Sequence, residues 1–251
     1  MFIDKDNQEL LLKLTSIITC TYPNTTPKQA TCFFFRKDNG KIIIVTNKHV
    51  FENATTAKLY LTAKDGVTNI IKNYDVNITL NSNEVNLHPD YDVSTLDFTT
   101  RYDSLVAQNI LPQITMLNEA GIFVNYDELD FIQEILMVGY PDGIIDLVTN
   151  NPVVRTGVTA TPIRHKYNNQ EIFLMDIPSF WGSSGSPILI ATEAGKIRLV
   201  GINFETELNE RPVYDKTYKD STKNIIGYVR IPNDIGRAVN SKIIKEMLDQ
   251  Y

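Results

Sequence analysis

Short strand-like segments separated by turn residues dominate the first part of the chain. Stretches rich in Ile, Val, Thr, Phe and Tyr alternate there with Gly, Asn and Asp, a pattern typical of antiparallel strands joined by turns. The sequence predicts strands at residues 16–22, 30–36, 42–46, 58–62, 69–80 and 93–99. The turn Asp38, Asn39, Gly40 between CFFFR and KIIIV is the clearest hairpin signal. We therefore expect an antiparallel, barrel-like first lobe.

A second group of strand signals follows a less regular stretch at about residues 111–130, which we expect to cross between two lobes. Its predicted strands are residues 134–139, 153–160, 172–177, 187–190, 197–204 and 225–231. No repeat of fixed period and no low-complexity tract interrupts the chain. We predict an all-β fold of two six-stranded antiparallel β-barrels, with lobes at residues 1–118 and 119–251 that form one unit.

Helical periodicity is confined to the two ends. Residues 6–14 predict a short helix with Leu10, Leu11 and Leu14 on one face. Near the other end, Asn233 or Asp234 is predicted to cap a helix that runs to about Asp249. Apolar residues recur there at intervals of four: Ile235, Val239, Ile243 and Met247.

Composition narrows the function classes. The 251 residues are 43% hydrophobic, enough for a sizeable core, and the formal net charge of −6 comes without a basic cluster, which argues against nucleic-acid binding. Acidic residues interrupt the N-terminal apolar residues, and no apolar run is long enough to cross a bilayer. We therefore expect a cytoplasmic protein with no membrane partner, in which Cys20 and Cys32 are reduced core thiols; in an exported chain the two could instead form a cross-strand disulfide.

The sequence GSSGSP at residues 182–187 carries the strongest chemical signal. A serine between two glycines in a tight turn can place its hydroxyl beside free backbone N–H groups, which suits an acyl-transfer nucleophile. We take Ser184 as the nucleophile and the N–H groups of Gly182 and Ser184 as donors to an oxyanion. The motif lacks the last glycine of the G-x-S-x-G elbow of α/β hydrolases, because Ser186 stands there.

A serine hydroxyl requires a base, and His49 in TNKHV is the candidate because it follows a predicted strand and a polar turn. His88 and His165 fit less well, since both lie in polar turn segments.

Asp92, which opens DVSTL, is the candidate that orients the imidazole, and Asp90 and Asp97 are its rivals. The order His49, Asp92, Ser184 along the chain favours the hypothesis of a serine protease.

These segments resemble the chymotrypsin-fold serine peptidases, nearer the bacterial high-temperature-requirement and glutamyl-endopeptidase types than the digestive enzymes. CFFFRKDNGKIIIVTNKHV is similar to the family's histidine segment, YDVSTLDF to its aspartate segment, WGSSGSPILI to its serine segment and VGINF to the strand behind its specificity pocket. The resemblance implies a serine endopeptidase with His49 as base, Asp92 as orienter and Ser184 as nucleophile. Two positions depart from the family: Ser183 stands where relatives usually carry Asp or Asn, and Cys32 where glycine is frequent.

The resemblance also implies a substrate-binding region. Pro178 stands where trypsin-like members carry an acid, so cleavage after Lys or Arg is not favoured. Asn203, Phe204 and Glu205 are expected beside the substrate backbone, and Trp181 near the pocket rim, although Trp181 and Phe204 could instead pack in the core and Glu205 could favour a basic residue.

The expected partner is a protein or peptide substrate, with a regulatory protein as a further partner that restrains activity. No cofactor or metal is expected, because three histidines and two cysteines show no ligand spacing. The alternative function is a catalytically silent or partner-gated module that binds peptides by strand addition next to residues 200–204.

Overall fold

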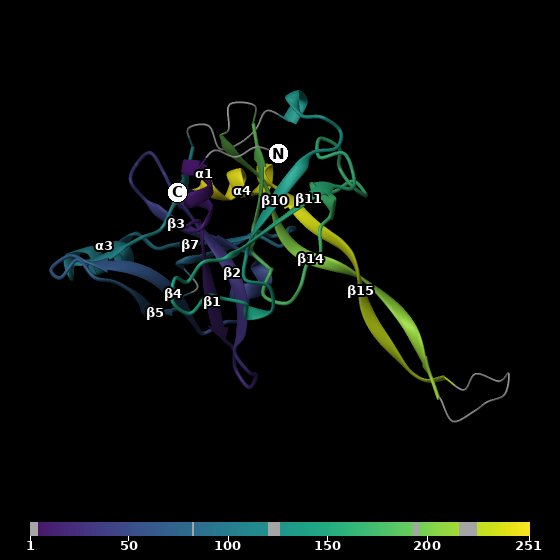
Figure 1. Cartoon of the computed structure of the whole chain (residues 1–251), viewed down its shortest axis with the longest axis horizontal. Coiled ribbons are helices and arrows are strands. Elements are labelled where there is room, and N and C mark those ends of the chain that lie inside the picture. Colours follow the sequence, from purple (N-terminus) through teal and green to yellow (C-terminus); the bar gives the residue numbers. More distant parts are fainter. Residues whose placement is uncertain (1–4, 82, 120–125, 193–195, 216–224) are drawn as a thin grey trace.

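β-Structure builds both halves of the chain in the computed structural model, which describes residues 5–81, 83–119, 126–192, 196–215 and 225–251 (Figure 1). The first lobe is one sheet with the strand order β5-β4-β1-β2-β3-β7-β6, to which β8 adds on β4 and β9 adds parallel to β2. Its strands are β1 Thr15–Thr21, β2 Lys28–Arg36, β3 Ile42–Thr46, β4 Thr56–Asp65, β5 Ile71–Thr79, β6 Val85–Leu87, β7 Ser94–Asp97, β8 Ile110–Pro112 and β9 Met116–Asn118. The six strands predicted in this lobe are present. The sheet has nine because β6, β8 and β9 are three residues long, too short for a periodic signal.

The second lobe is a closed antiparallel barrel in the order β10-β11-β12-β15-β14-β13. Its strands are β10 Glu134–Gly139, β11 Val153–Thr159, β12 Ile172–Asp176, β13 Pro187–Ala191, β14 Ile197–Tyr214 and β15 Ile225–Asn240. The predicted all-β fold is confirmed, and this lobe has the six strands expected of it.

Three apolar clusters hold the molecule together, one inside each lobe and one between them. Alternation along β2 explains the division: Phe34 points into the first lobe, whereas Phe33 and Phe35 point into the cluster between the lobes. The cluster between the lobes also takes side chains from both lobes and from segments near both chain ends, including Leu11, Leu14, Val45, Val138, Leu189, Ile243 and Met247. The seam between the lobes is therefore a packed interface.

Within the described ranges, four α-helices and two 3-10 turns lie around the sheets. They are α1 Lys5–Leu11, α2 Lys48–Phe51, α3 Thr99–Ala107, α4 Ser241–Leu248, η1 Tyr126–Glu128 and η2 Pro141–Gly143. In α1 and the turn after it Leu11 and Leu14 are buried, but Leu10, predicted on the same face, is 46% exposed. Among the described residues no helix is both long and apolar enough to span a bilayer.

The predicted start of the C-terminal helix is wrong. Residues 225–240 form β15, and α4 begins only at Ser241, where the Asn240 side chain caps it by accepting a hydrogen bond from the Lys242 N–H at 3.0 Å. Ile235 and Val239 lie in the barrel strand that pairs with β12 and β14. Pairing on both sides outweighed the local helical spacing, which is valid only for Ile243 and Met247.

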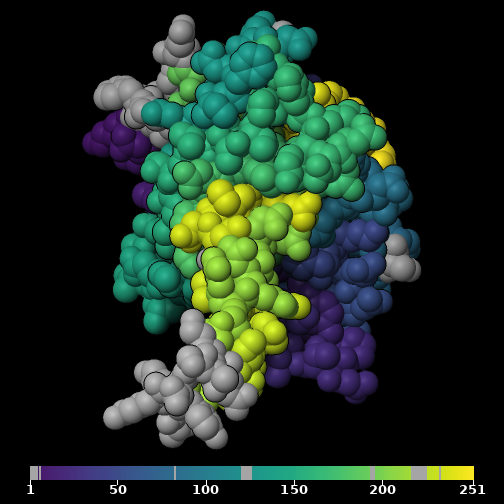
Figure 2. Space-filling model, turned by 90° about the vertical axis from the view of Figure 1, so that its right-hand side faces the viewer, coloured from purple at the N-terminus to yellow at the C-terminus, as the bar shows by residue number. Residues whose placement is uncertain are grey.

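The strands β14 and β15 extend well beyond the barrel. Residues 205–214 and 225–234 form a two-stranded ribbon, here called the arm, that projects from the second lobe (Figures 1 and 2). The sequence predicted strands there only to residue 204 and from 225 to 231, so the length of the arm was not foreseen.

Candidate active site

His49 and Asp92 are joined by two hydrogen bonds. The backbone N–H of His49 donates to Asp92 Oδ1 at 2.9 Å, and His49 Nδ1 lies 2.6 Å from Asp92 Oδ2. His49 lies in the short helix α2 directly after β3, and Asp92 lies in the turn before β7, the strand paired with β3. The side chain of Asn47 braces that turn by donating to Asp92 O at 2.7 Å. The pair is therefore held by the first-lobe sheet, with the imidazole half exposed.

The rival residues have other partners. Asp97 accepts hydrogen bonds from the N–H and the hydroxyl of Thr99, at 3.0 and 2.6 Å. His88 Nδ1 accepts from the backbone N–H of Asp90 at 3.1 Å, and the His165 ring stacks edge-on against Phe131. These contacts are local and leave Asp92 as the carboxylate at His49.

Ser184 comes to the same seam from the second lobe. Its carbonyl accepts the N–H of Thr31 at 2.8 Å, and the Thr31 carbonyl in turn accepts the hydroxyl of Thr46, which ends the strand before His49. Thr31 on β2 thus ties the serine loop to the histidine segment. Among the described residues the Ser184 hydroxyl has no hydrogen-bond partner, and such contacts are often long in free enzymes.

The loop before Ser184 presents two free donors. Asp142 N–H donates to Trp181 O at 2.5 Å, and because a trans peptide points its N–H opposite to its C=O, this bond turns the Gly182 N–H away from Asp142. Thr31 Oγ1 donates to Gly182 O at 2.9 Å and fixes the next peptide. No acceptor among the described residues takes the N–H of Gly182 or of Ser184. The two N–H groups can therefore receive an anionic oxygen.

Gly182 is required by this geometry. Its φ is +82°, and a Cβ at this position would run into the carbonyl oxygen of Tyr140. The positive φ and the close backbone together explain why glycine stands here.

Arg155 on β11 supports the same loop, and sequence reasoning missed it. Its guanidinium donates to Pro178 O and, at 2.9 Å, to the hydroxyl of Ser183, a fully buried residue. Burial lowers the pKa of Arg155 to about 10, so it remains a cation at neutral pH, and the nearby Asp142 carboxylate favours that charge. Ser183, which stands where relatives usually carry Asp or Asn, is thus held by the Arg155 cation from strand β11.

The predicted substrate-binding residues fall into two sets. Asn203 is buried and its side-chain N–H₂ donates to Ser179 Oγ at 2.9 Å and Ser183 O at 3.0 Å, so it fixes the loop from behind. Pro178 is half-buried at the start of that loop. Both lie at the base of the serine loop.

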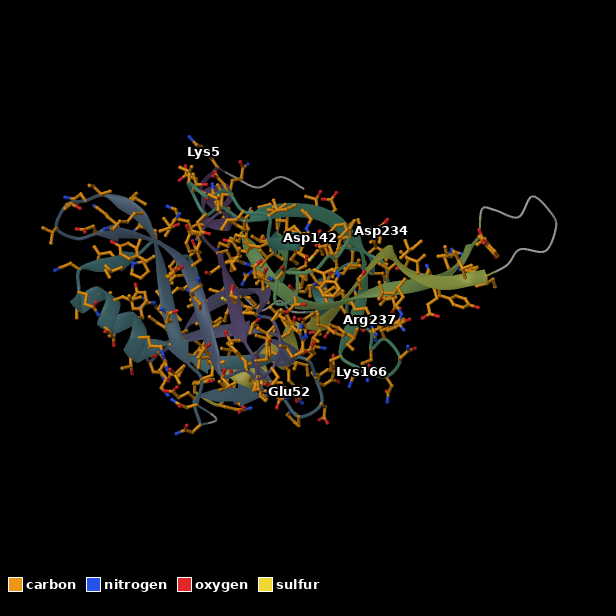
Figure 3. The ribbon with its side chains drawn as sticks, turned by 90° about the horizontal axis from the view of Figure 1, so that it is seen from below. Lys5, Glu52, Asp142, Lys166, Asp234 and Arg237 are labelled. Atoms are coloured by element: carbon orange, nitrogen blue, oxygen red, sulfur yellow. The ribbon has the colours of Figure 1, made fainter. Side chains whose placement is uncertain are left out.

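The remaining three lie toward the surface. Trp181 is 89% exposed, so it does not pack in the core. Phe204 is half-buried against the cluster between the lobes, under the Arg237 guanidinium at 5.4 Å. Glu205 is exposed and pairs with Arg237 at 2.7 Å, at the base of the arm where Figure 3 labels Arg237.

The two β-lobes packed along one seam have the arrangement of the chymotrypsin fold, with the histidine-aspartate pair on one side of the seam and the glycine-flanked serine on the other. The sequence model of the trypsin-like peptidase domain matches residues 30–202, more than half of the chain. The chain therefore belongs to the trypsin-like peptidase family.

Solved structures with the same fold include HtrA-type proteases, as the resemblance implied. The HtrA-type protease AlgWS227A with a tripeptide has a TM-score of 0.57 at 15% identity, over 96% of this chain and 60% of that one. A protease from M. tuberculosis in its active form gives 0.52 at 12% identity, over 99% and 87%. Protease Anisep from Arthrobacter nicotinovorans gives 0.52 at 12% identity, over 95% of each chain. No curated protein matches, and the chain spans about 60% of the length of the AlgW protein.

Proposed function

We propose that the protein is a serine endopeptidase that acts through His49, Asp92 and Ser184. The observation that carries the proposal is the pair of hydrogen bonds between Asp92 and His49, which leaves Nε2 of the imidazole directed away from the carboxylate, toward a substrate or nucleophile. The tie from Thr46 through Thr31 to Ser184 supports the approach of the serine to that nitrogen.

The chemistry follows in two half-reactions. His49 Nε2 accepts the Ser184 hydroxyl proton as the oxygen bonds to the carbonyl carbon, and the carbonyl oxygen takes the negative charge. The N–H groups of Gly182 and Ser184 stabilise that charge, and each such donor contributes about 3 kcal/mol to lowering the barrier. His49 returns the proton to the amine nitrogen, the peptide bond breaks, and an acyl ester on Ser184 remains. Water, deprotonated by His49, then releases the acid.

The residue before the cut is proposed to be small or apolar. Pro178 replaces the acid that would attract Lys or Arg, and Glu205 has its charge paired by Arg237. A basic side chain would thus find no free carboxylate at these two positions. This proposal depends on the expected positions of Asn203, Phe204 and Trp181 beside the substrate.

A second candidate is a partner-gated or silent peptide-binding module. The Ser184 hydroxyl, without a hydrogen bond to His49, is the observation that favours it. In this case a regulatory protein would draw the serine and histidine together, a control that also suits a cytoplasmic protease.

Labelling with an organophosphonate serine probe tests the proposal. We expect covalent attachment at Ser184 that is lost in Ser184→Ala and His49→Ala but kept in His165→Ala, the matched histidine control. Cleavage of a diverse peptide library by the same preparations then reports the residue preferred before the cut. A folded protein with neither labelling nor cleavage would favour the binding module.

A further inference from the structure

The arm leaves one strand edge open from the serine loop outward. On one side β14 pairs with β13 only as far as Ile202, and β12 pairs with β15 only from Ile235 onward. Among the described residues the two arm strands pair only with each other. Beyond Asn203, the edge of β14 that faces away from β15 therefore has no partner strand among the described residues.

This open edge begins beside the serine loop. Asn203 donates its N–H to Ser186 O and accepts the Gly185 N–H, each at 2.9 Å, so its peptide groups face the serine loop and not β15. Further along, the same side of β14 runs out into the arm. A chain bound at Ser184 can thus continue along the arm edge, provided that it follows the two register shifts of β14 between Asn203 and Leu208.

Two prolines reveal which backbone groups face outward. Pro212 pairs with Tyr228, and Pro232 pairs with Leu208. Leu208 and Pro212 are four residues apart on β14, so their backbone groups face the same edge. Proline is accommodated in a strand where its nitrogen faces away from the partner strand. Leu208 and Glu210 lie at alternate positions with Pro212 on β14, so their N–H and C=O groups point to the open edge.

The two edges of the arm differ in continuity. On β15 the edge is interrupted at Pro232, next to the barrel, whereas on β14 the first proline is Pro212, near the far end. At about 3.4 Å per residue, the β14 edge between Asn203 and Pro212 is about 30 Å long and free of proline, although its pairing with β15 shifts register between Asn203 and Glu205 and between Thr206 and Leu208. The edge that is open to strand addition is the one that starts at the nucleophile.

The surface of the arm suits an apolar chain. Its three glutamates are paired with arginines: Glu210 with Arg230 at 3.0 Å, and Glu205 and Glu207 with Arg237, at the base of the arm, at 2.7 and 3.6 Å. Large apolar side chains on it are 39–67% exposed: Leu208, Val213, Ile226, Tyr228, Val229 and Ile231. Figure 1 shows the arm extending away from both lobes.

We propose that the arm part of this edge, from Leu208 to Pro212, is an additional binding site for the substrate, which pairs there as an added strand through an extended, apolar segment several residues before the scissile bond. This rests on the proposed peptidase function. The preceding flank is assigned because Asn203, where the edge starts, contacts Ser179 and Ser183 of the loop expected to form the pocket for the residue before the cut. Backbone pairing supplies affinity, and the apolar side chains of the arm select the segment.

The test compares two lengths of one substrate. A peptide cleaved in the library assay is made with about ten residues before the cut and in a form shortened to about three. The wild-type protein is compared with Glu210→Pro, which removes one outward N–H, and with Glu210→Ala, which loses the same ion pair and keeps that N–H. Circular dichroism verifies that both variants are folded.

We expect the wild type and Glu210→Ala to cleave the long peptide with at least about tenfold higher kcat/KM than the short one. Glu210→Pro should lose about fivefold on the long peptide, the effect of one hydrogen bond, and nothing on the short one. Equal cleavage of both lengths by the wild type, or equal loss on both lengths in Glu210→Pro, would overturn the proposal while leaving the peptidase function intact.

Failure of the proposed function is separately visible, as absence of probe labelling and of cleavage of either peptide. Fluorescence anisotropy with the labelled long peptide then decides, and equal binding by Glu210→Pro and Glu210→Ala would overturn the edge proposal. Analytical ultracentrifugation tests whether a second copy of the chain occupies the edge instead. A dimer that Glu210→Pro dissociates and Glu210→Ala does not would assign the edge to that copy and would overturn the proposal.

Discussion

Both oxygens of the Asp92 carboxylate are held by His49, one through its backbone N–H and the other through its ring. The position and the tautomer of the imidazole thus depend on a single side chain.

Asp92→Asn should therefore lower kcat without unfolding the protein. The amide oxygen can still accept the His49 backbone N–H, but the amide N–H₂ facing Nδ1 would impose the wrong tautomer. We expect a loss of about 10⁴-fold in kcat, as is typical of triads, with a melting temperature close to that of the wild type. Asp90→Asn is the control, and comparable loss in that variant would contradict the assignment of Asp92.

Gly182→Ala should remove the oxyanion site. Its Cβ would meet Tyr140 O and displace the Gly182 N–H, which we expect to cost about 10²–10³-fold in kcat. Gly40→Ala is a matched control, because Gly40 has a similar φ of +89° but open space around it. That variant should lose about 1–2 kcal/mol of stability from backbone strain and no activity. Equal activity in both variants would mean that the Gly182 N–H does not participate.

Arg155→Met should loosen the serine loop. It removes the arginine donor of Pro178 O and leaves the buried Ser183 hydroxyl with only the Phe180 N–H at 3.3 Å, at a cost of about 1–3 kcal/mol of stability and a roughly 10–100-fold lower kcat on short peptides. Arg155→Lys should be intermediate, since one ammonium cannot reproduce the fork of the guanidinium. Arg230→Met, in the exposed pair on the arm, should leave short-peptide cleavage unchanged. Wild-type kcat in Arg155→Met would contradict a positioning role.

The two cysteines should be inert in the folded protein. Both are free and buried, and burial raises the pKa of Cys20 to about 12 and that of Cys32 further. Iodoacetamide at about pH 8 should modify neither thiol in the native protein and both in concentrated guanidinium, as mass spectrometry would report. Rapid native alkylation would contradict this burial.

The same raised pKa values set a direction for stability against pH. An acid whose pKa is higher folded than unfolded stabilises the fold below the unfolded pKa, and that contribution is lost as pH rises above it. The free energy of unfolding should therefore fall above about pH 8.5, where unfolded thiols ionise. Urea titrations across this range should show a shallower decline in Cys32→Ala than in the wild type.

Sequence reasoning predicted most strands because alternating apolar residues and turn signals are local properties. Residues 42–46 and 134–139 agree with β3 and β10 at both ends. The start of α4 could not be found in this way, since the pairing of residues 225–240 with two distant strands decided it. Among the site residues, His49, Asp92, Gly182 and Ser184 stand in recognisable motifs.

Arg155 has no such motif. Its role depends on the register between β11 and its neighbours, which brings it to Ser183 from another part of the chain. The arm was missed for a related reason, because exposed ribbons carry mixed polar and apolar residues without a clear alternation. Features that depend on contacts between distant parts of the chain are thus the ones that local sequence patterns did not predict.

The cluster between the lobes takes Leu11 and Leu14 from the segment of α1 and Ile243 and Met247 from α4. These side chains pack against the side chains of both sheets, and the proposed approach of Ser184 to His49 depends on that packing. A bulky fusion or a proteolytic cut beside either helix would loosen this packing. The reaction rate would then report damage at a distance from the candidate active site.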